Sequence, residues 1–341
     1  KLSTAKEGTE FTVLSTEKFD GREKAEAARA EVIGARTVRI VKVESKEARE
    51  KVYAAMKKLN YQPNQLARSF HSKKTFYIGL LIPDVTIPFF TEMTGRIETR
   101  LHKQGYKLFL CNAKGRGTDE VQYLNMLFQN KVDGIIIGTH MLKTEDYRDI
   151  ELPVVALDVT LSDSIPIVSS DHAKGGRLAA EEFVRNQCKC VIQLVGDVNI
   201  KTPSFIRNNV FSQILKENNI RRINYSMKNS ELSRERYYSI AKKIFEEYPQ
   251  IDGVFSTDLV VANVMKYLLD IGKKIPEDVK IVGYDGGDVA KLMYPSMTYV
   301  EQPFDLIADK IVDILLKKIN GENISSSIFL PEIILVRVMT T

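Results

Sequence analysis

Cysteine and histidine are scarce in this chain. Three cysteines (Cys111, Cys188 and Cys190) and four histidines occur in 341 residues. So few thiols give no disulfide framework, which is typical of proteins kept in a reducing compartment. The pair Cys188-Lys-Cys190 has no nearby His or Cys to complete a tetrahedral metal site, and no two histidines have metal-ligand spacing. We therefore expect a cytoplasmic protein that binds no metal.

Long hydrophobic runs are absent as well. No apolar stretch reaches the length that crosses a bilayer. The segment Lys1-Leu-Ser-Thr-Ala-Lys-Glu7 lacks the apolar region of a secretory signal peptide. Hydrophobic residues make up 44% and charged residues 27%, which is typical of a globular protein, and the length favours two or three domains. These features predict no membrane partner and no export.

The sequence also lacks the motifs of common enzymes. No Gly-x-Gly-x-x-Gly follows a predicted strand, and the P-loop pattern does not occur, since Lys114-Gly-Arg-Gly117 has neither spacing. No Gly-x-Ser-x-Gly nucleophile elbow is present. Carboxylates leave a glycosidase-like pair open, but no pair stands out. We predict that the chain is not an enzyme and uses no cofactor, with a sugar-modifying enzyme as the lowest-ranked alternative.

Positive charge is concentrated near the N-terminus. Residues 1–75 contain 17 Lys and Arg against 10 Asp and Glu, a net charge of +7. The rest of the chain has 32 against 34, a net charge of −2. Such a distribution is typical of a small nucleic-acid-binding module on a nearly neutral body. Taken alone, an ordinary solvated helical surface explains it equally well.

The first 60 residues are expected to be helical. Residues 21–42 are rich in Ala, Glu and Arg and predict a helix. Ser45 is a suitable N-cap for a helix that reaches about Asn60. The apolar stripe of that helix is Val52, Ala55, Met56 and Leu59. Pro63 cannot continue this helix but suits the first turn of a short new one over 64–70, which needs outside support to be stable.

The body of the chain alternates strands with helices. Strands are expected at 76–83, 107–111, 134–137, 154–157, 167–169, 191–195, 253–256, 280–284, 327–330 and 333–338. The expected helices are one through Ile97 and Leu101, and 120–130, 175–186, 204–218, 234–247, 258–270 and 305–320. This alternation predicts parallel βαβ units, and its restart near residue 175 predicts two doubly wound α/β lobes with a cleft between them.

The hinge sequence points to a family. Tyr61-Gln-Pro-Asn-Gln-Leu-Ala-Arg-Ser69, after Lys51-Val-Tyr-Ala-Ala-Met-Lys-Lys-Leu59, resembles the hinge of the lactose-repressor (LacI/GalR) family of bacterial transcription regulators. The resemblance runs from about Val43 to the end. The family has a helix-turn-helix in the region of 21–42, but Glu31-Val32 stand where its Ala-Gly turn is usual, so no base-reading side chain is assigned.

The resemblance implies a division of the chain. Residues 1–60 would form a helix-turn-helix-like DNA-binding head, and 61–75 the hinge helix and linker. The core would be periplasmic-binding-protein-like, with one lobe from 76–169 plus 303–330 and the other from 170–302 plus 331–341.

The hinge residues implied to contact DNA are Asn64, Ala67, Arg68 and Phe70. Phe70 takes the place of an apolar wedge that unstacks a base step from the minor groove. A docking role on the body for Leu66 and Phe70 is the alternative.

The effector site is expected at the carboxyl ends of the parallel strands. The polar residues there are Asp84, Thr139, Asp158, Asp171, Asp197, Thr257, Asp258 and Asp285. The resemblance implies that Phe89 and Phe90 line the first lobe, that Arg207 clamps the ligand, and that Asp285 and Gln302 bind hydroxyls. Asp84, Asp171, Thr257 and Asp258 are further candidates. Asp158 either bridges the lobes or contacts the ligand, and Ile87 replaces an Asn that is usual in the family.

Together these features predict a homodimeric repressor of a sugar-utilisation operon. Its partners would be a pseudo-palindromic operator and a sugar or sugar phosphate bound between the lobes. In some branches of the family a partner protein acts as corepressor. The sequence leaves open whether this chain has such a protein partner. The main alternative is a solute-binding receptor of the same two-lobe fold without DNA binding, which the basic head and the missing export signal oppose.

Overall fold

The computed structural model describes residues 10–13, 30–33, 37–40, 46–59, 74–114, 116–139, 147, 150–196, 202–227, 234–324, 328–329 and 331–341. The chain divides into two compact units. The first comprises residues 1–76 with 131–133, and the second comprises residues 77–130 with 134–341.

The described part of the first unit contains a small sheet and a helix. Strands β1 (Glu10–Val13), β2 (Ala30–Ile33) and β3 (Thr37–Ile40) pair in the order β1-β3-β2, and helix α1 spans Lys46–Lys58. Helix α1 agrees with the helix predicted after Ser45. The helix predicted across 21–42 is wrong at β2 and β3, where β-branched residues such as Val32, Val38 and Ile40 favour extended backbone over helix.

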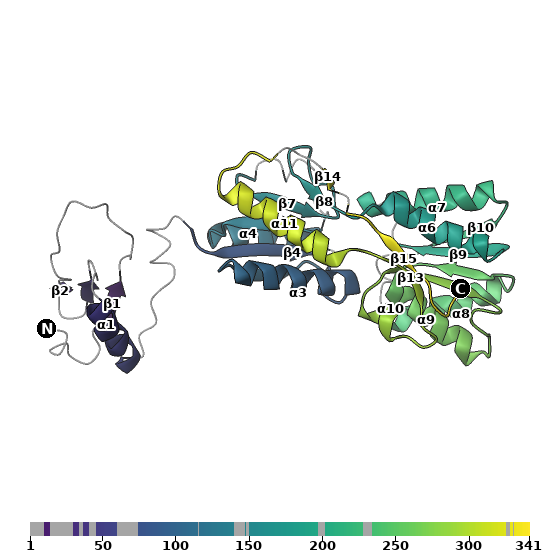
Figure 1. Cartoon of the computed structure of the whole chain (residues 1–341), viewed down its shortest axis with the longest axis horizontal. Helices are drawn as coiled ribbons and strands as arrows, with labels where there is room; N and C mark the ends of the chain where they lie inside the picture. The colour runs from purple at the N-terminus through teal and green to yellow at the C-terminus, as the bar shows by residue number, and fades with distance from the viewer. Residues whose placement is uncertain are drawn as a thin grey trace. The chain divides into compact units, whose positions relative to one another are not determined.

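The second unit is built on two six-stranded sheets (Figure 1). The first sheet has the order β14-β8-β7-β6-β4-β5, and every pairing in it is parallel. Its strands are β4 (Tyr77–Ile82), β5 (Lys107–Asn112), β6 (Gly134–Ile137), β7 (Val154–Leu157), β8 (Ile167–Val168) and β14 (Ile328–Phe329). Helices α3 (Pro88–Lys103) and α11 (Phe304–Ile319) share one core with this sheet, and α4 (Gly117–Gln129) completes the first lobe.

The second sheet has the order β10-β9-β11-β12-β13-β15. Its strands are β9 (Cys190–Val195), β10 (Arg221–Ser226), β11 (Gly253–Phe255), β12 (Lys280–Asp285), β13 (Thr298–Glu301) and β15 (Ile334–Val336). Only β15 runs antiparallel to its neighbour, β13, among the described pairings of this sheet.

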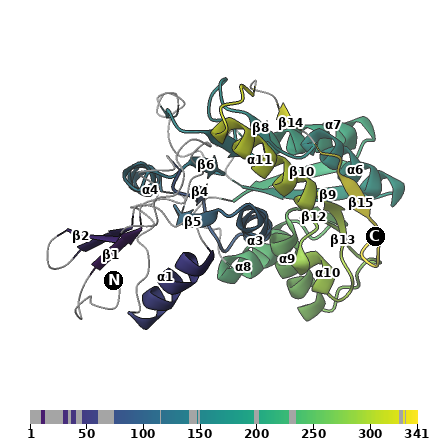
Figure 2. The same cartoon turned by 60° about the vertical axis from the view of Figure 1, so that its left-hand side comes forward.

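Helices cover both faces of the second sheet, as both views show (Figures 1 and 2). The helices of this second lobe are α6 (His172–Arg185), α7 (Ile206–Glu217), α8 (Arg234–Glu247), α9 (Asp258–Asp270) and α10 (Asp288–Leu292), with a 3-10 turn η2 (Pro203–Phe205). Val191 packs with α6 and α7, whereas its neighbour Ile192 packs with α8 and α9. Side chains that alternate along a strand thus reach separate cores, which explains the continuous apolar strand sequences.

The chain passes between the two sheets three times. It crosses from β8 to α6, from β13 to α11, and from β14 to β15. The two-lobe, doubly wound α/β core predicted from the alternation is therefore confirmed. Strand β10 was not predicted, because its sequence Arg-Arg-Ile-Asn-Tyr-Ser pairs only with β9 at the sheet edge and leaves every second residue exposed.

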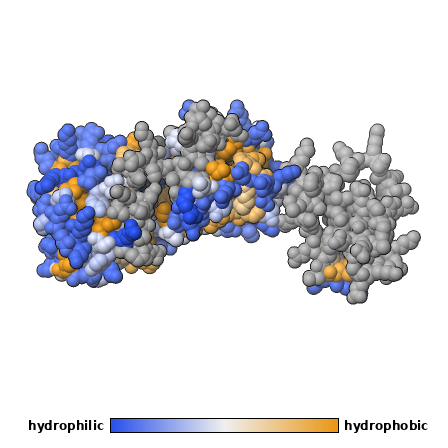
Figure 3. Space-filling view, turned by 180° about the vertical axis from the view of Figure 1, so that it is seen from behind, coloured by the Kyte–Doolittle hydropathy of each residue, from blue (hydrophilic) through white to orange (hydrophobic). Residues whose placement is uncertain are grey.

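The face in Figure 3 is mostly hydrophilic, with separate hydrophobic patches. In the part of the chain that the structure describes, no helix is both long and apolar enough to span a membrane.

Candidate functional site

His172 joins the two lobes at the first crossing. It begins α6, and its side chain is 1% exposed. Its Nε2 lies 2.8 Å from Oδ1 of Asp158, which follows β7 in the first lobe. Its Nδ1 lies 2.7 Å from the hydroxyl of Tyr284 in β12 of the second lobe. Both ring nitrogens are therefore used. The bond to Asp158 spans the lobes, whereas the bond to Tyr284 lies within the second lobe, so a rotation of one lobe against the other acts on the Asp158 bond.

Asp158 is held as a carboxylate. Burial works to raise its pKa, but the attraction of His172 and hydrogen bonds from His172 and Ser169 outweigh burial and lower it. The Ser169 hydroxyl donates to Asp158 Oδ1 over 2.5 Å. The backbone of Asp158 has φ +55°, a left-handed conformation that Asp tolerates better than most residues. A sharp turn thus directs this carboxylate toward the second lobe.

Arg207 is placed by a close approach of α6 and α7. A Cβ at Gly176 of α6 would lie 2.8 Å from the Arg207 Cα, and one at Gly175 would lie 2.9 Å from Tyr284 Cε2. Only glycine leaves room for this packing. The guanidinium carbon of Arg207 lies 4.2 Å from the centre of the Tyr284 ring, a cation–π contact that fixes its position.

Asp285 and Gln302 form the second half of the site. Gln302 donates from Nε2 to Asp285 Oδ1 over 2.8 Å, and its Oε1 accepts from the Ser170 hydroxyl over 2.7 Å. Burial raises the pKa of Asp285 to about 6, although the nearby Arg207 and the bond from Gln302 act to lower it. This carboxyl group therefore changes charge close to neutral pH.

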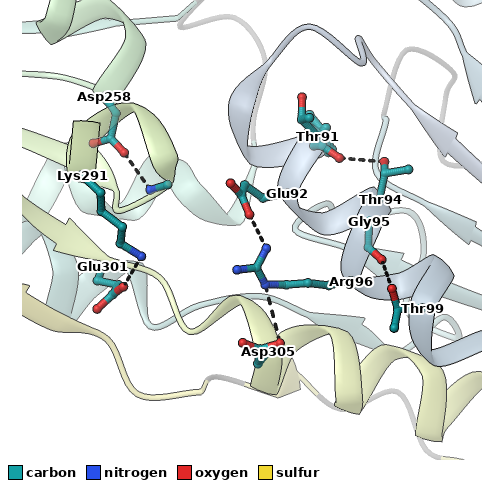
Figure 4. A network of polar contacts seen from close by, with 12 residues as sticks. Thr91, Glu92, Thr94, Gly95, Arg96, Thr99, Asp258, Lys291, Glu301 and Asp305 are labelled. Atoms are coloured by element: carbon teal, nitrogen blue, oxygen red, sulfur yellow. Dashed lines mark hydrogen bonds and ion pairs between the residues drawn. The ribbon is translucent and has the colours of Figure 1, made fainter. Parts of the chain in front are cut away.

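Asp258 supports the turn that follows Asp285. Its Oδ2 accepts from the backbone N–H groups of Gly286 (2.8 Å) and Gly287 (3.1 Å), a contact drawn in Figure 4. Burial, and then the charge of Asp285, raise its pKa well above the ordinary value. Its Oδ1 has no hydrogen-bond partner among the described residues. Asp258 thus positions Asp285, while Thr257 is half-buried at the start of α9 and makes no capping bond there.

Asp84 and Asp171, two further predicted residues, each stabilise a local piece of backbone. Asp84 Oδ1 accepts from the backbone N–H and the hydroxyl of Thr86, which closes the turn after β4. Asp171 caps α6 by accepting from the Lys174 backbone N–H over 2.9 Å.

The two predicted aromatic residues differ in depth. Phe89 is buried in the core of the first lobe, with its ring centre 5.8 Å from that of Phe304. Phe90 is half-buried, and its ring lies edge-on to Phe89. Phe90 is therefore the better placed of the two to touch a ligand.

Charged side chains flank the second crossing, as Figure 4 shows. Arg96 of α3 pairs with Glu92 and lies 3.6 Å from Asp305 at the start of α11. Lys291 of α10 lies 3.0 Å from Glu301 at the end of β13. These pairs tie the segment on either side of Gln302 to its own lobe, so that the crossing itself can act as a hinge.

The structure brings three of the predicted residues together, namely Arg207, Asp285 and Gln302. His172 and Tyr284 were missed, although each adjoins a residue that was named, Asp171 and Asp285. The hinge residues Asn64, Ala67, Arg68 and Phe70, and the strand-end residue Asp197, lie outside the described residues.

This arrangement suits a polyhydroxylated ligand. Carboxylates accept hydrogen bonds from paired hydroxyls, a guanidinium donates to oxygens or phosphate, and aromatic faces cover C–H surfaces. Among the described residues, no three His, Cys, Asp or Glu side chains are grouped so that they could hold a metal ion. The three cysteines are buried, and burial raises the pKa of each thiol.

Comparison with known proteins found a matching family profile and relatives that are named operon repressors. The profile described as periplasmic binding proteins and sugar binding domain of LacI family matches residues 75–332. The ribose operon repressor of Halalkalibacterium halodurans is 37% identical over 81% of this chain and 82% of its own length. The sucrose operon repressor of Streptococcus mutans is 38% identical over 82% of this chain and 86% of its own length.

Solved structures agree. A periplasmic binding protein/LacI transcriptional regulator from Alkaliphilus metalliredigens in complex with D-xylulofuranose is 30% identical, with a TM-score of 0.70, over 78% of this chain and 98% of that one. A LacI family transcriptional regulator from Enterococcus faecalis with bound ribose is 27% identical, with a TM-score of 0.68, over the same shares.

Proposed function

The chain belongs to the LacI family, and we propose that it is a DNA-binding transcriptional repressor of a sugar-utilisation operon. The observation that carries this proposal is the cluster of Arg207, Asp285 and Gln302 beside the lobe-bridging pair of Asp158 and His172. Relatives of similar length are named as ribose and sucrose operon repressors. The protein would act by binding rather than by catalysis, and would work in the cytoplasm.

The effector would be a sugar or sugar phosphate between the lobes. Arg207 would donate to a ring oxygen, hydroxyl or phosphate, and Asp285 would accept from a pair of hydroxyls. Gln302 keeps Asp285 in place and lies on a crossing, so that ligand contacts there act directly on the hinge. The titles of two structural relatives name D-xylulofuranose and ribose, which makes pentoses the first sugars to test.

Effector binding would alter the arrangement of the lobes. A ligand shifts such an equilibrium only by its difference in affinity for the two arrangements. The bond from His172 to Asp158 belongs to the arrangement described here, and a second arrangement would exchange it for another. The hinge segment 61–75 would carry this change to the DNA-binding head.

The repressor would be a homodimer on a pseudo-palindromic operator. Two large side chains near the end of α10 are strongly exposed, Leu292 at 83% and Tyr294 at 79%. Met339 is also exposed, and its backbone N–H donates to the Ser296 carbonyl beside them. An apolar patch of this kind is typical of a protein–protein interface, and a second copy would cover it. A protein corepressor would be a further partner.

The test of the effector site is calorimetric titration of a sugar panel that contains ribose, xylulose and sucrose. Arg207→Ala should weaken binding of the responding sugar at least about tenfold, since a hydrogen bond to a charged group contributes about 1.5–3 kcal/mol. Arg177→Ala, which removes an exposed arginine from α6, is the matched control and should bind normally. Equal affinity in the Arg207 variant and the wild type would refute the assignment.

A further inference from the structure

A polar cavity outside the interlobe site lies between α7 and the edge of the second sheet. Its volume is about 390 Å³, within the size range of small-ligand pockets. One face of α7 supplies Asn208, Ser212 and Lys216, which recur every four residues, and β10 supplies Arg222. The remaining lining residues are Val195, Phe205, Asn209, Gln213 and Asn224. Arg207 is on the same helix but does not line this cavity.

The composition of the lining favours a negatively charged ligand. It contains two cations, four side-chain amides and one hydroxyl, and no Asp or Glu among the described residues that line it. The nearest carboxylate that bonds to the lining is Glu217, which accepts from Gln213 Nε2 over 2.8 Å and does not itself face the cavity. Nine lining residues of average composition would include about one acidic residue, because 44 of the 341 residues are Asp or Glu.

The buried amide of Gln193 bonds to two residues that line this cavity. Gln193 of β9 is 1% exposed, and its Nε2 donates to Asn208 Oδ1 over 2.8 Å. Its Oε1 accepts from Arg222 Nη1 over 3.1 Å. The Asn208 oxygen is thereby occupied while its two N–H donors remain, and the Arg222 guanidinium is fixed with several donors to spare. The side chains most firmly held around the cavity are therefore hydrogen-bond donors.

Arg222 is the cation that β10 contributes to the cavity. Burial lowers its pKa, and no carboxylate pairs with it in the described part of the chain. Arg222 is exposed as a residue, but part of its side chain is desolvated, and a bound anion would offset the cost of that desolvation. Planar guanidinium groups match phosphate oxygens in a two-pronged geometry, whereas lysine adds a point charge.

We infer that this cavity is a binding site for a small phosphate-bearing ligand, separate from the interlobe sugar site. The inference does not depend on which sugar the interlobe site binds. Because α7 carries Arg207 as well as the cavity lining, a ligand held here would bear on the helix that positions the sugar-binding arginine.

The test uses the full chain and two probes, inorganic phosphate and D-ribose 5-phosphate, with ribose as the unphosphorylated comparison. Binding is followed by phosphorus NMR line broadening and by calorimetry. Arg222→Gln should weaken phosphate binding at least about tenfold, the effect of losing a charged hydrogen bond. Ser212→Asp, which places a carboxylate in the cavity and leaves Arg222 intact, should do the same.

Two variants serve as matched controls. Arg221→Gln removes the same charge from the neighbouring residue of β10, which lines the adjoining hollow instead of this cavity, and should retain binding within about threefold. Arg207→Gln should retain binding of inorganic phosphate while it loses binding of ligands at the interlobe site.

Three results would overturn the inference. Equal losses in the Arg221 and Arg222 variants would mean diffuse surface charge. Loss in the Arg207 variant with retention in the Arg222 variant would place the phosphate between the lobes. Absence of phosphate binding at about 10 mM in low salt would mean that the cavity holds no such ligand.

Discussion

At the scale of single residues, the carboxyl group of Asp285 is expected to link ligand affinity to pH. Its pKa is raised to about 6 by burial, so that it loses its charge as pH falls through this value. A sugar whose hydroxyls donate to the carboxylate needs the ionised form. We predict that affinity is constant above pH 7 and falls about tenfold by pH 5, one unit below the pKa. Calorimetry at pH 5, 6 and 7.5 measures this.

The corresponding control is Asp285→Asn, which cannot ionise. This variant should bind more weakly than the wild type at pH 7.5 and show a much flatter pH profile. A wild-type affinity that does not change between pH 5 and 7.5 would contradict the role given to Asp285.

His172 is the second residue with a measurable role. Its replacement by alanine removes the lobe-bridging hydrogen bond to Asp158 and the bond to Tyr284 within the second lobe, and it leaves the largely buried Asp158 carboxylate short of a donor. We predict a loss of about 2 to 3 kcal/mol in the free energy of unfolding. Urea denaturation checks this value. His102→Ala on the exposed side of α3 should change stability by less than about 0.5 kcal/mol, and comparable losses in both variants would argue against a bridge.

The site around Asp285 and His172 also shows which contacts can be predicted from the sequence and which cannot. Arg207, Asp285 and Gln302 could be predicted because the family resemblance reaches them. That Asp158 and Tyr284 both bond to the imidazole of His172 depends on a left-handed backbone at Asp158 and on the crossing geometry, which no local pattern encodes. The fact that Asp258 supports a turn, and that Phe89 is core, likewise appears only when the tertiary contacts are known.

At the scale of elements, strands with a continuous apolar sequence in the second unit were predictable, whereas the polar strand β10 and the short strands β2 and β3 were not. β6 and β7 are buried at every residue, and their predicted bounds agree with the structure. β10 is a polar edge strand, and β2 and β3 lie in a region rich in helix-forming residues. Local propensity therefore failed where strand pairing, rather than burial of a long apolar run, determines the fold.

The contact of α6 with α7 gives a prediction about glycine. Gly176→Ala would push a methyl group against the Arg207 backbone, and overpacking of this kind costs about 1–3 kcal/mol. We expect lower stability and weaker sugar binding together. Gly95→Ala on α3 is the matched control, because nothing lies within 4 Å of the added Cβ and alanine favours the helix by up to about 1 kcal/mol. The midpoint temperature of thermal unfolding should be highest for Gly95→Ala, intermediate for the wild type and lowest for Gly176→Ala. The opposite order would show that the helices do not pack closely.

The C-terminal segment is fastened to α6 by Glu182, whose side chain is fully buried. It pairs with Arg185 and accepts from Arg337 Nε over 2.7 Å. Burial acts to raise its pKa, but the bonds from Arg185 and Arg337 lower it to about 2. A depressed pKa means that this contribution to stability is present above pH 4.5 and is lost as pH falls toward 2.

Glu182→Gln should accordingly lose about 3 kcal/mol of unfolding free energy at pH 7, and the difference from wild type should shrink at pH 3. Glu181→Gln, which changes the exposed neighbour, should have little effect at either pH. Urea denaturation of the wild type and of both variants at pH 7 and pH 3 measures these differences in unfolding free energy. A difference that stays constant from pH 7 to pH 3 would show that the charge of Glu182 is not what holds the segment.

At the scale of the whole molecule, one chain joins a basic N-terminal region to a two-lobed core with a polar site at its crossings. The N-terminal 75 residues carry a net charge of +7, so phosphate contacts should dominate DNA affinity and make it steeply dependent on salt. In the proposed function, the core would supply the sugar response through the bond that spans the lobes. Neither part alone gives a regulator, whereas a receptor without DNA binding would need only the core.

The most direct test is a fluorescence-anisotropy titration of a pseudo-palindromic operator duplex against a random duplex, at two salt concentrations, with and without the sugar panel. The account predicts tight, salt-sensitive binding that prefers the operator and that one sugar shifts in the wild type but not in Arg207→Ala. Sugar binding without any preference for the operator would contradict it and would favour a solute-binding receptor.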